Sequence, residues 1–277
     1  MTKSATNPHP RFGMMNHPGR DLETEILAAA KLGFDFLDLT LEPPEASVED
    51  FPVRKIRAAL KKQNLGLVGH TGWHLQGNAA YREARAGVTR VLLDSLCIFH
   101  SLGAEVMTYH IHGSLAGYLG LQSGIDSQVE TLKPVVREAE NLGMTVLLEH
   151  VSGYPEQFEI LDALFSELPS LGFHLDVGHA NLTPDGTNAT SQFLFRYGSR
   201  LRHIHFSDNR GRTDDHMPLG VGSVPWDDIV RELKAASYRG TITLEIFSTD
   251  SEYLSLSLAR AREWFDIGVF NRSEPKC

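Results

Sequence analysis

The chain has 277 residues, 42% of them hydrophobic and 22% charged, an ordinary composition for one large α/β domain or two small ones. Its net charge of −9 argues against a free nucleic-acid-binding protein, which usually presents a basic surface, although bound divalent cations would offset clustered carboxylates. Its two cysteines form no CxxC motif and no apolar run reaches the roughly 18 residues of a membrane span, so we expect a cytoplasmic protein with reduced thiols.

One unit repeats along the chain after a polar, proline-containing segment at residues 1–10. Each copy has a short apolar run, a loop and an amphipathic segment with helical periodicity. Asp21 is expected to cap the first helix and Gly33 to end it. The expected strand and helix pairs, in chain order, are 11–15 and 21–32, 34–39 and 50–62, 65–70 and 80–101, 104–110 and 126–142, 144–150 and 156–167, 171–177 and 188–199, 201–206 and 226–236, and 241–247 and 251–267.

Eight strand–helix units in one chain of this length predict an α/β fold of the (β/α)₈ TIM barrel class. The strands are almost continuously apolar, which is typical of a parallel sheet buried on both faces. The main alternative is a doubly wound open sheet, but no G-x-G-x-x-G motif follows the first strand. We expect a single barrel domain over 11–268, a flexible N-terminal tail at 1–10 and a C-terminal tail at 269–277.

Polar side chains that can bind metal follow six consecutive predicted strands. Because the carboxyl ends of parallel strands meet at one rim of a barrel, we expect these side chains to lie together. Nitrogen and oxygen ligands suit Zn, Mn, Fe or Co, and the scarcity of cysteine argues against a thiolate site. The residues are His70, His110, His112, Glu149, Asp176, His179, His205, Asp208 and Glu245.

The densest group of such residues lies in the segment HIHFSDNRGRTDDHMPLGVGSVPW, which begins at His203. It reads as the end of a buried strand followed by a Gly-rich loop, and it carries Asp214, Asp215 and His216 as well as the strand histidines. A metal site explains this composition, and a polar surface loop is the alternative. Of the two strand histidines we prefer His205 as a ligand, because it lies closer to the loop.

Strand alternation separates some of the remaining histidines. His110 and His112 share one face of their strand, so both can point inward. His150 has the opposite parity to Glu149, so it is expected to pack against the helices if Glu149 faces the site. Trp73 is either a stacking wall for a ligand or a rim-packing residue. We expect three other histidines to be structural: His74, His100 and His174.

The sequence resembles the xylose isomerase-like TIM barrels. The resemblance covers nearly the whole chain and rests on LLEH, HLDVGHANL, the segment from His203 to Trp226, and GTITLEIF. That superfamily contains sugar and sugar-phosphate isomerases and epimerases, and apurinic/apyrimidinic endonucleases of the endonuclease IV type. The resemblance is specific for the superfamily and leaves the reaction open.

The epimerase branch implies one divalent metal, often Mn, bound by two glutamates, an aspartate and a histidine. The matching residues are Glu149, Asp176, His205 and Glu245, and the two glutamates would also act as the catalytic acid and base. The resemblance implies that His179 contacts the substrate, and Arg210 is the nearest candidate for a substrate-binding arginine. Trp73 and His112 complete our expected substrate-binding set.

The endonuclease branch implies a trinuclear zinc cluster that uses the same four ligands and five more, which match His70, His110, His179, Asp214 and His216. The chain departs from that branch in the acidic, proline-rich segment TLEPPEASVED, where the endonucleases carry polar and basic DNA-penetrating residues.

We therefore predict a metal-dependent sugar or sugar-phosphate isomerase or epimerase with a small carbohydrate as its partner. An endonuclease IV-like phosphodiesterase is the alternative, and another lyase or hydrolase on this scaffold stays open. We expect neither nucleic acid nor a membrane as a partner, and the sequence leaves a homo-oligomer open.

Overall fold

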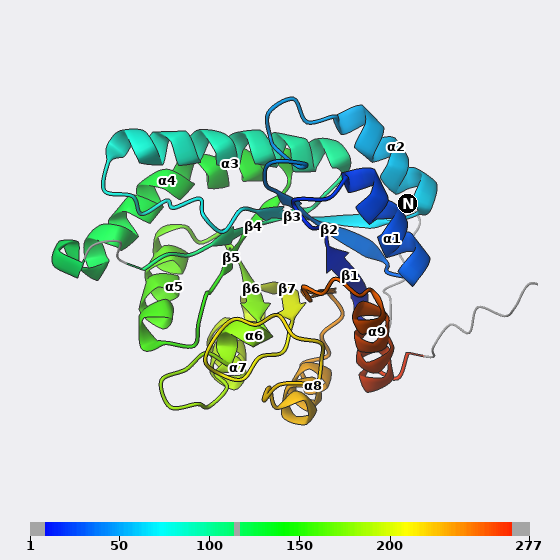
Figure 1. The fold of residues 1–277 in the computed structure, drawn as a ribbon. Coiled ribbons are helices and arrows are strands. Elements are labelled where there is room, and N and C mark those ends of the chain that lie inside the picture. The colour runs from blue at the N-terminus through cyan, green and yellow to red at the C-terminus, as the bar shows by residue number, and fades with distance from the viewer. Residues whose placement is uncertain (1–8, 114–116, 268–277) are drawn as a thin grey trace, which may run out of the picture.

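A computed structural model describes residues 9–113 and 117–267 of the chain (Figure 1). Eight parallel strands close into a barrel in sequence order, with β8 hydrogen-bonded to β1. This closure confirms the predicted (β/α)₈ barrel and excludes the open sheet. The strands are β1 (Arg11–Met15), β2 (Phe36–Leu41), β3 (Gly66–Thr71), β4 (Val106–His110), β5 (Thr145–Glu149), β6 (Gly172–Asp176), β7 (Leu201–Phe206) and β8 (Thr241–Leu244).

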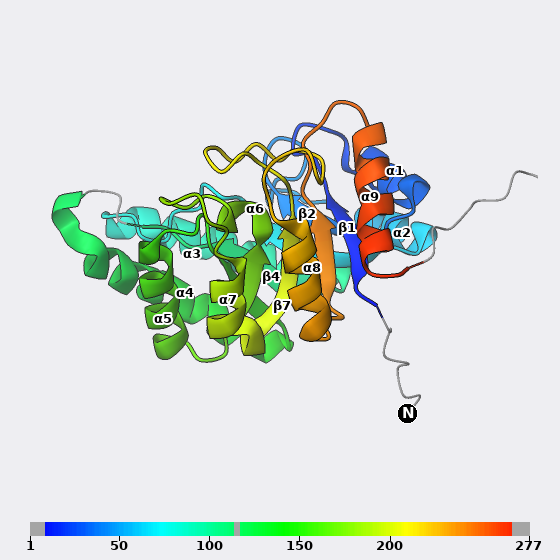
Figure 2. The same cartoon turned by 90° about the horizontal axis from the view of Figure 1, so that it is seen from below.

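Helices surround the barrel, and the loops that follow the strands gather at one end of it, at the top of Figure 2. The two longest helices, α3 and α4, extend beyond the strands on one side (Figures 1 and 2). The helices are α1 (Leu22–Leu32), α2 (Val53–Gln63), α3 (Arg82–Leu102), α4 (Gly120–Leu142), α5 (Pro155–Glu167), α6 (Val177–Ala180), α7 (Thr190–Tyr197), α8 (Trp226–Ala235) and α9 (Glu252–Trp264), with 3₁₀ turns η1 (Gly117–Leu119) and η2 (Gly198–Arg200). In the described part of the chain, no helix is long and apolar enough to cross a membrane.

The predicted caps of α1 are confirmed. The Asp21 side chain accepts a hydrogen bond from the Thr24 backbone N–H, which satisfies a free donor of the first turn. Gly33 ends the helix in the left-handed conformation, with φ of 88°, where a residue without Cβ avoids strain. The sequence therefore fixes both ends of this helix locally.

Several predicted boundaries were wrong, and one short helix was missed. Helix α4 begins at Gly120 instead of near 126, and its first turns bury Ile125. Strand β8 ends at Leu244 instead of 247, because the Phe247 backbone N–H turns away to the carbonyl of His216. The short helix α6 directly after β6 was not expected, since four residues carry no helical period.

Two different environments lie on the two faces of the barrel strands. Outward side chains pack against the helices and belong to one large hydrophobic core. Inward side chains are largely polar near the carboxyl ends, while Phe36, Val68 and Leu147 are buried outside that large core. The apolar layer between strands and helices thus stabilises the fold and leaves the barrel interior available for polar groups.

We expect Gly13→Ala to destabilise the protein. A Cβ at this buried position in β1 would lie 2.2 Å from the Phe36 ring, which has no space to move away. Overpacking of this kind costs about 1–3 kcal/mol, measurable as a loss of unfolding free energy in urea. Gly87→Ala in α3 is the control, because a Cβ there meets nothing within 4 Å and should stabilise the helix by about 0.5–1 kcal/mol. Equal stability of the two variants would contradict this packing.

Candidate metal centre

Four predicted ligands converge at the carboxyl ends of four neighbouring strands. Glu149 and Asp176 end β5 and β6, His205 is the penultimate residue of β7, and Glu245 follows β8 directly. Asp176 and His205 are register partners in adjacent strands, so their side chains point the same way. One ligand atom from each of the four residues lies within 4.8 Å of the others.

The imidazole of His205 lies among the three carboxylates. Its Nδ1 is 3.1 Å from Glu245 Oε2, 3.5 Å from Glu149 Oε1 and 3.5 Å from Asp176 Oδ2. Glu149 Oε1 and Asp176 Oδ2 are buried and form no hydrogen bond with any described residue. Buried carboxylate oxygens left without a donor, beside an imidazole nitrogen, are the donor set that a divalent cation satisfies.

Burial and neighbouring charges shift the pKa values of these residues in opposite directions. Burial disfavours protonation of His205, but the carboxylates of Glu245 and Glu149 outweigh it and hold the pKa of His205 well above its ordinary value. Burial raises the pKa of Glu149, and the neighbouring histidines only partly offset this. For Asp176 the histidines prevail over burial, chiefly His179, and lower its pKa to about 2.

A second group shares Glu149. His70 Nε2 and His110 Nε2 each lie 3.1 Å from Glu149 Oε2, and ligand atoms of the three residues lie within 4.8 Å of one another. His110 and Glu149 are register partners of β4 and β5. Burial lowers the pKa of His110 well below its ordinary value, so its ring is neutral and can offer a lone pair. Glu149 therefore presents one oxygen to each group.

A third group lies on the solvent side of the first. Asp214, in the loop after β7, has Oδ2 3.0 Å from His179 Nε2 and 2.9 Å from His216 Nε2. Despite burial, Glu245 and Asp214 raise the pKa of His216 to about 9. His216 Nδ1 in turn lies 3.5 Å from Glu245 Oε2, which joins this group to the first. The fold thus brings to one rim all nine residues that match the ligands of the endonuclease branch.

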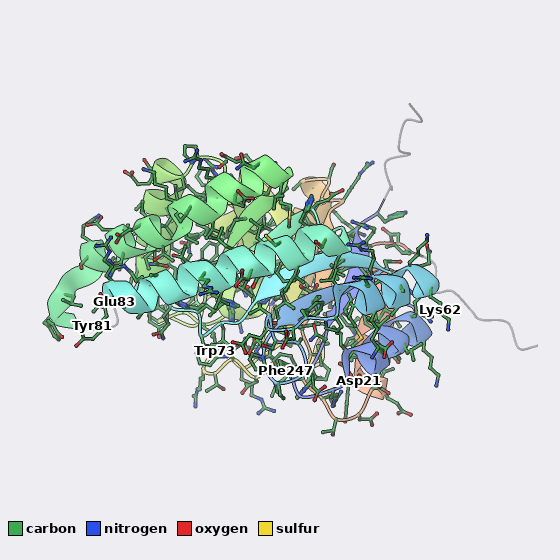
Figure 3. All side chains as sticks on the ribbon, turned by 90° about the horizontal axis from the view of Figure 1, so that it is seen from above. Asp21, Lys62, Trp73, Tyr81, Glu83 and Phe247 are labelled. Carbon is green, nitrogen blue, oxygen red and sulfur yellow. The ribbon has the colours of Figure 1, made fainter. Side chains whose placement is uncertain are left out.

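A cavity of about 560 Å³ opens over these groups, within the range of small-molecule sites. His70, His110, His179 and Glu245 contribute to its lining. Trp73 and Phe247 also line the cavity, are 64% and 53% exposed, and lie on the same side of the molecule (Figure 3). The cavity therefore has polar metal-competent groups inside and exposed aromatic rings among its walls.

Two expected substrate-binding residues lie outside that lining. Arg210 is exposed in the loop after β7. His112 is half-buried, with Nε2 3.3 Å from the Leu75 carbonyl, and burial lowers its pKa to about 4. The ring is therefore neutral and its Nε2–H donates to that carbonyl. A substrate contact from either residue stays a prediction.

Asp208 was grouped with the rim ligands from its place in the sequence, but its carboxylate turns into the loop. It accepts hydrogen bonds from the backbone N–H groups of Gly220 and Val224 and from the indole of Trp226. Asp208 also pairs with Met217 through two backbone hydrogen bonds. Its role is to shape the loop that carries Asp214 and His216, because a buried carboxylate needs donors and the loop supplies them.

The other histidines divide between the two strand faces. His150 stacks on Phe193 of α7 with ring centroids 3.8 Å apart, which confirms the expectation that it packs against helices. His174, which we expected to be structural, faces the barrel interior with Nδ1 3.4 Å from Glu149 Oε2. Its parity with Asp176 in β6 explains this orientation.

Sequence reasoning missed one buried carboxylate beneath the site, that of Asp38 in β2. Its Oδ2 is 2.9 Å from His205 Nε2 and 3.0 Å from His203 Nε2. Burial opposes its ionisation, but the two histidines hold the pKa of Asp38 far below its ordinary value. The signal in the sequence is a single charge inside the apolar strand FLDLTL.

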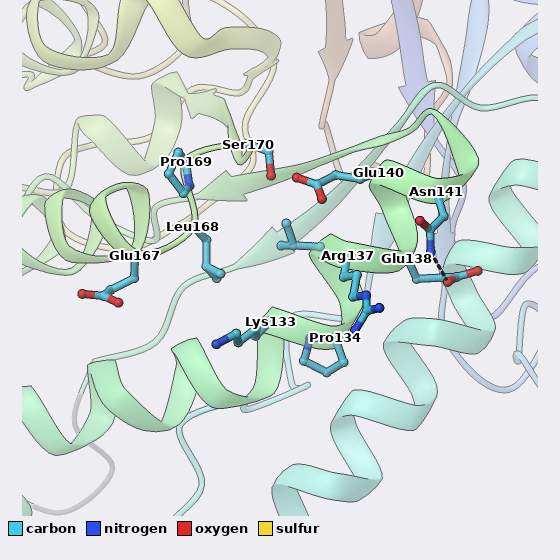
Figure 4. A pocket seen from close by; sticks show the side chains of 11 residues that line it. Lys133, Pro134, Arg137, Glu138, Glu140, Asn141, Glu167, Leu168, Pro169 and Ser170 are labelled. Atoms are coloured by element: carbon cyan, nitrogen blue, oxygen red, sulfur yellow. Dashed lines mark hydrogen bonds between the residues drawn. The ribbon is translucent and has the colours of Figure 1, made fainter.

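A second hollow, of about 700 Å³, lies between α4 and the segment after α5 (Figure 4). Lys133, Arg137 and Glu167 line it, and a hydrogen bond joins Asn141 to Glu138 at its edge. Its residues directly precede β5 and β6, so it lies near the amino ends of the strands. In this fold that end carries stability and the other end carries chemistry, so we place the candidate site at the carboxyl ends.

Comparisons with known proteins agree with this geometry. A family model described as xylose isomerase-like TIM barrel matches residues 26–266. A fructoselysine 3-epimerase of Escherichia coli is 24% identical over 245 residues, 83% of this chain and 87% of that protein. An L-ribulose 3-epimerase of Methylomonas is 25% identical over 243 residues, 81% of this chain and 78% of that protein.

One further relative matches only part of the chain, and one solved structure matches nearly all of it. An uncharacterized protein of Methanocaldococcus jannaschii is 30% identical over 129 residues, so this match spans less than half of either protein, 44% of this chain and 43% of the relative. The crystal structure of a D-tagatose 3-epimerase-like protein has a TM-score of 0.82 at 21% identity and covers 93% of this chain and 97% of that one. At that identity the structural likeness shows the fold.

We expect His150→Gln to weaken the pH dependence of stability of the metal-free protein. Burial lowers the pKa of His150 from 6.5 to about 3, so between these values the unfolded chain binds a proton that the folded protein excludes. Wild-type unfolding free energy should then fall below pH 6.5, with a contribution from this residue of about 1.4 kcal/mol per pH unit.

Urea unfolding from pH 7.5 to 5 in a chelator measures this effect as the difference between wild type and variant. His100→Gln, at an exposed position of α3, is the control and should keep the wild-type slope. Identical slopes for His150→Gln and wild type would contradict the assignment.

Proposed function

This chain belongs to the xylose isomerase-like TIM barrel family, and on that premise we propose that it is a metal-dependent sugar or sugar-phosphate epimerase or isomerase. The observation that carries the proposal is the convergence of Glu149, Asp176, His205 and Glu245, with two glutamates in one group. Relatives that match more than four fifths of the chain include a fructoselysine 3-epimerase and an L-ribulose 3-epimerase, which supports a carbohydrate substrate.

The proposed metal site fits the donors present. Three carboxylates and one imidazole suit Mn, Zn, Fe or Co, and two of the carboxylate oxygens are buried without a hydrogen-bond donor. A divalent ion bound there would polarise the carbonyl oxygen of the substrate and stabilise negative charge that develops on it. The chain's own residues would then supply the proton transfer.

Glu149 and Glu245 are the proposed acid and base. Each comes from a different strand, so a sugar held over the site can meet one glutamate on each face. One carboxylate removes the proton from the carbon next to the carbonyl, and the other returns a proton to the opposite face in an epimerase. Burial raises the pKa of Glu149, which makes its carboxylate a stronger base than an exposed one.

The residues that line the cavity indicate which chemical groups the substrate carries away from the metal. Among its described residues are Trp73, Phe247 and Glu42, but no lysine or arginine. Exposed aromatic rings pack against the C–H face of a sugar, and Glu42 can accept hydrogen bonds from its hydroxyls. This favours an unphosphorylated sugar over a sugar phosphate within the proposed class.

We expect the Mn-loaded protein to catalyse solvent deuterium incorporation at the carbon next to the carbonyl of an accepted ketose. Glu245→Gln keeps the side-chain shape but removes the base, so exchange should fall by about 10²-fold or more. Mass spectrometry of ketoses and their phosphates measures the effect. Glu252→Gln, at an exposed position of α9, should keep the wild-type rate.

A double variant tests whether His70 and His110 are essential metal ligands or only peripheral to the proton transfer. If the enzyme moves a proton, His70→Ala combined with His110→Ala should retain measurable exchange, because these residues then only shape the pocket or hold an extra ion. Exchange that survives in Glu245→Gln would refute the assigned role of that glutamate. Absence of exchange by wild type across a broad panel would count against the sugar enzyme.

An endonuclease IV-like phosphodiesterase is the second candidate function. The specific observation in its favour is the presence of two further donor groups beside the first: His70, His110 and Glu149, and His179, Asp214 and His216. Three bound zinc ions would activate water and stabilise the leaving oxygen. The acidic segment after β2 and the net charge of −9 oppose binding of a DNA duplex.

We expect no efficient incision of a DNA duplex that carries an abasic site, with either Mn or Zn present. The physical reason is repulsion between the phosphate backbone and an acidic protein that has no lysine or arginine in its described cavity lining. Gel analysis of an end-labelled duplex measures the incision, with Glu149→Gln as the background control. Metal-dependent cleavage well above that control would make the phosphodiesterase the better assignment.

A further inference from the structure

The carboxylate of Asp38 is a charged group in the barrel interior that the proposed chemistry does not use. Asp38 is fully buried in β2. Its Oδ2 accepts hydrogen bonds from His205 Nε2 at 2.9 Å, His203 Nε2 at 3.0 Å and Thr243 Oγ1 at 2.8 Å. These donors come from β7 and β8, so the contacts reach through the barrel interior past β1, the strand between β2 and β8.

The bond to Asp38 determines which nitrogen of His205 faces the candidate metal centre. Because an ionised carboxylate only accepts hydrogen bonds, His205 must carry a proton on Nε2. The opposite nitrogen, Nδ1, then points at the carboxylates of Glu149, Asp176 and Glu245. A metal-binding histidine needs this arrangement, with one nitrogen held by a carboxylate and the other free to bind.

The second histidine on Asp38 has no free nitrogen. His203 Nε2 is bound to Asp38 and its Nδ1 lies 2.6 Å from Thr241 Oγ1. His203 and Thr243 therefore hold the Asp38 carboxylate in place and leave His205 as the group on which it acts. The two histidines, two residues apart on β7, thus have different functions because only the outer one reaches the rim.

We propose that Asp38 is a positioning residue that fixes the tautomer and ring orientation of His205, and thereby raises the affinity of the centre for its divalent metal. The inference rests on the metal requirement of the proposed function. It adds a residue that touches neither metal nor substrate and acts through His205 alone.

The test is isothermal titration of the metal-free protein with Mn²⁺, which requires no substrate. Loss of such a partner typically costs 10–100-fold in metal affinity, so Asp38→Asn should raise the Kd of the central site by about 10–100-fold. Glu25→Gln is the matched control: it makes the same carboxylate-to-amide change at a buried position of α1 that contacts His17 and Arg20 and no proposed ligand, and should change the Kd by less than about threefold.

The outcomes separate the inference from the function it rests on. A folded Asp38→Asn variant with the wild-type Kd would overturn the positioning role, even if its melting temperature fell. Failure of the wild type to bind Mn²⁺, Zn²⁺, Fe²⁺ or Co²⁺ would instead overturn the proposed function. If activity of Asp38→Asn recovers in excess Mn²⁺, the residue acts through metal affinity, as we propose.

A measurement on the wild type keeps the inference testable if Asp38→Asn does not fold. In protein loaded with ¹¹³Cd²⁺, ¹⁵N NMR should show coupling of the metal to Nδ1 of His205 and a retained proton on Nε2. Metal coordination through Nε2 would contradict the role of Asp38, because that nitrogen cannot bind the metal and donate a hydrogen bond to Asp38 at the same time.

Discussion

Buried negative charge without a buried lysine or arginine is the constraint on which this structure depends. Asp38, Glu149 and Asp176 are fully inaccessible, and the described buried residues include neither basic type. An ionised carboxylate without a counter-charge is too costly to keep inside a protein. Imidazoles therefore surround each carboxylate. Among the oxygens left without a donor, those of Glu149 and Asp176 lie beside His205 Nδ1, where a bound cation would balance the remaining negative charge.

The apolar layer between strands and helices stabilises the fold enough to offset the cost of a polar barrel interior. Strand side chains that face the helices form a continuous hydrophobic core, and the interior contributes little to it. Phe36 and its neighbours fill the amino-terminal part of the interior, which leaves the carboxyl end for histidines and carboxylates. Because stability resides in one layer and chemistry in another, the barrel can carry charged groups that would disrupt a single core.

In the loop after β7, too, a buried carboxylate is surrounded by hydrogen-bond donors, and this arrangement positions residues at the rim. Asp208 gathers backbone donors and the Trp226 indole around one buried carboxylate, and so gives a long loop a defined shape. That shape presents Asp214 and His216 above Glu245. His216 has a positive φ of 46°, which is uncommon for a residue with a side chain, and the surrounding contacts hold it there.

The sequence by itself determined the repeating units, the barrel, and the residues at the strand ends, because helical and strand periods are local and parallel strands put their carboxyl ends at one rim. Parity also placed His150 against the helices. Only the tertiary structure decided that Glu149 is shared by two donor groups, that His174 faces the interior, and that Asp38 meets His205. Those contacts join residues up to 167 positions apart, and barrel closure and strand register create them, which no local pattern encodes.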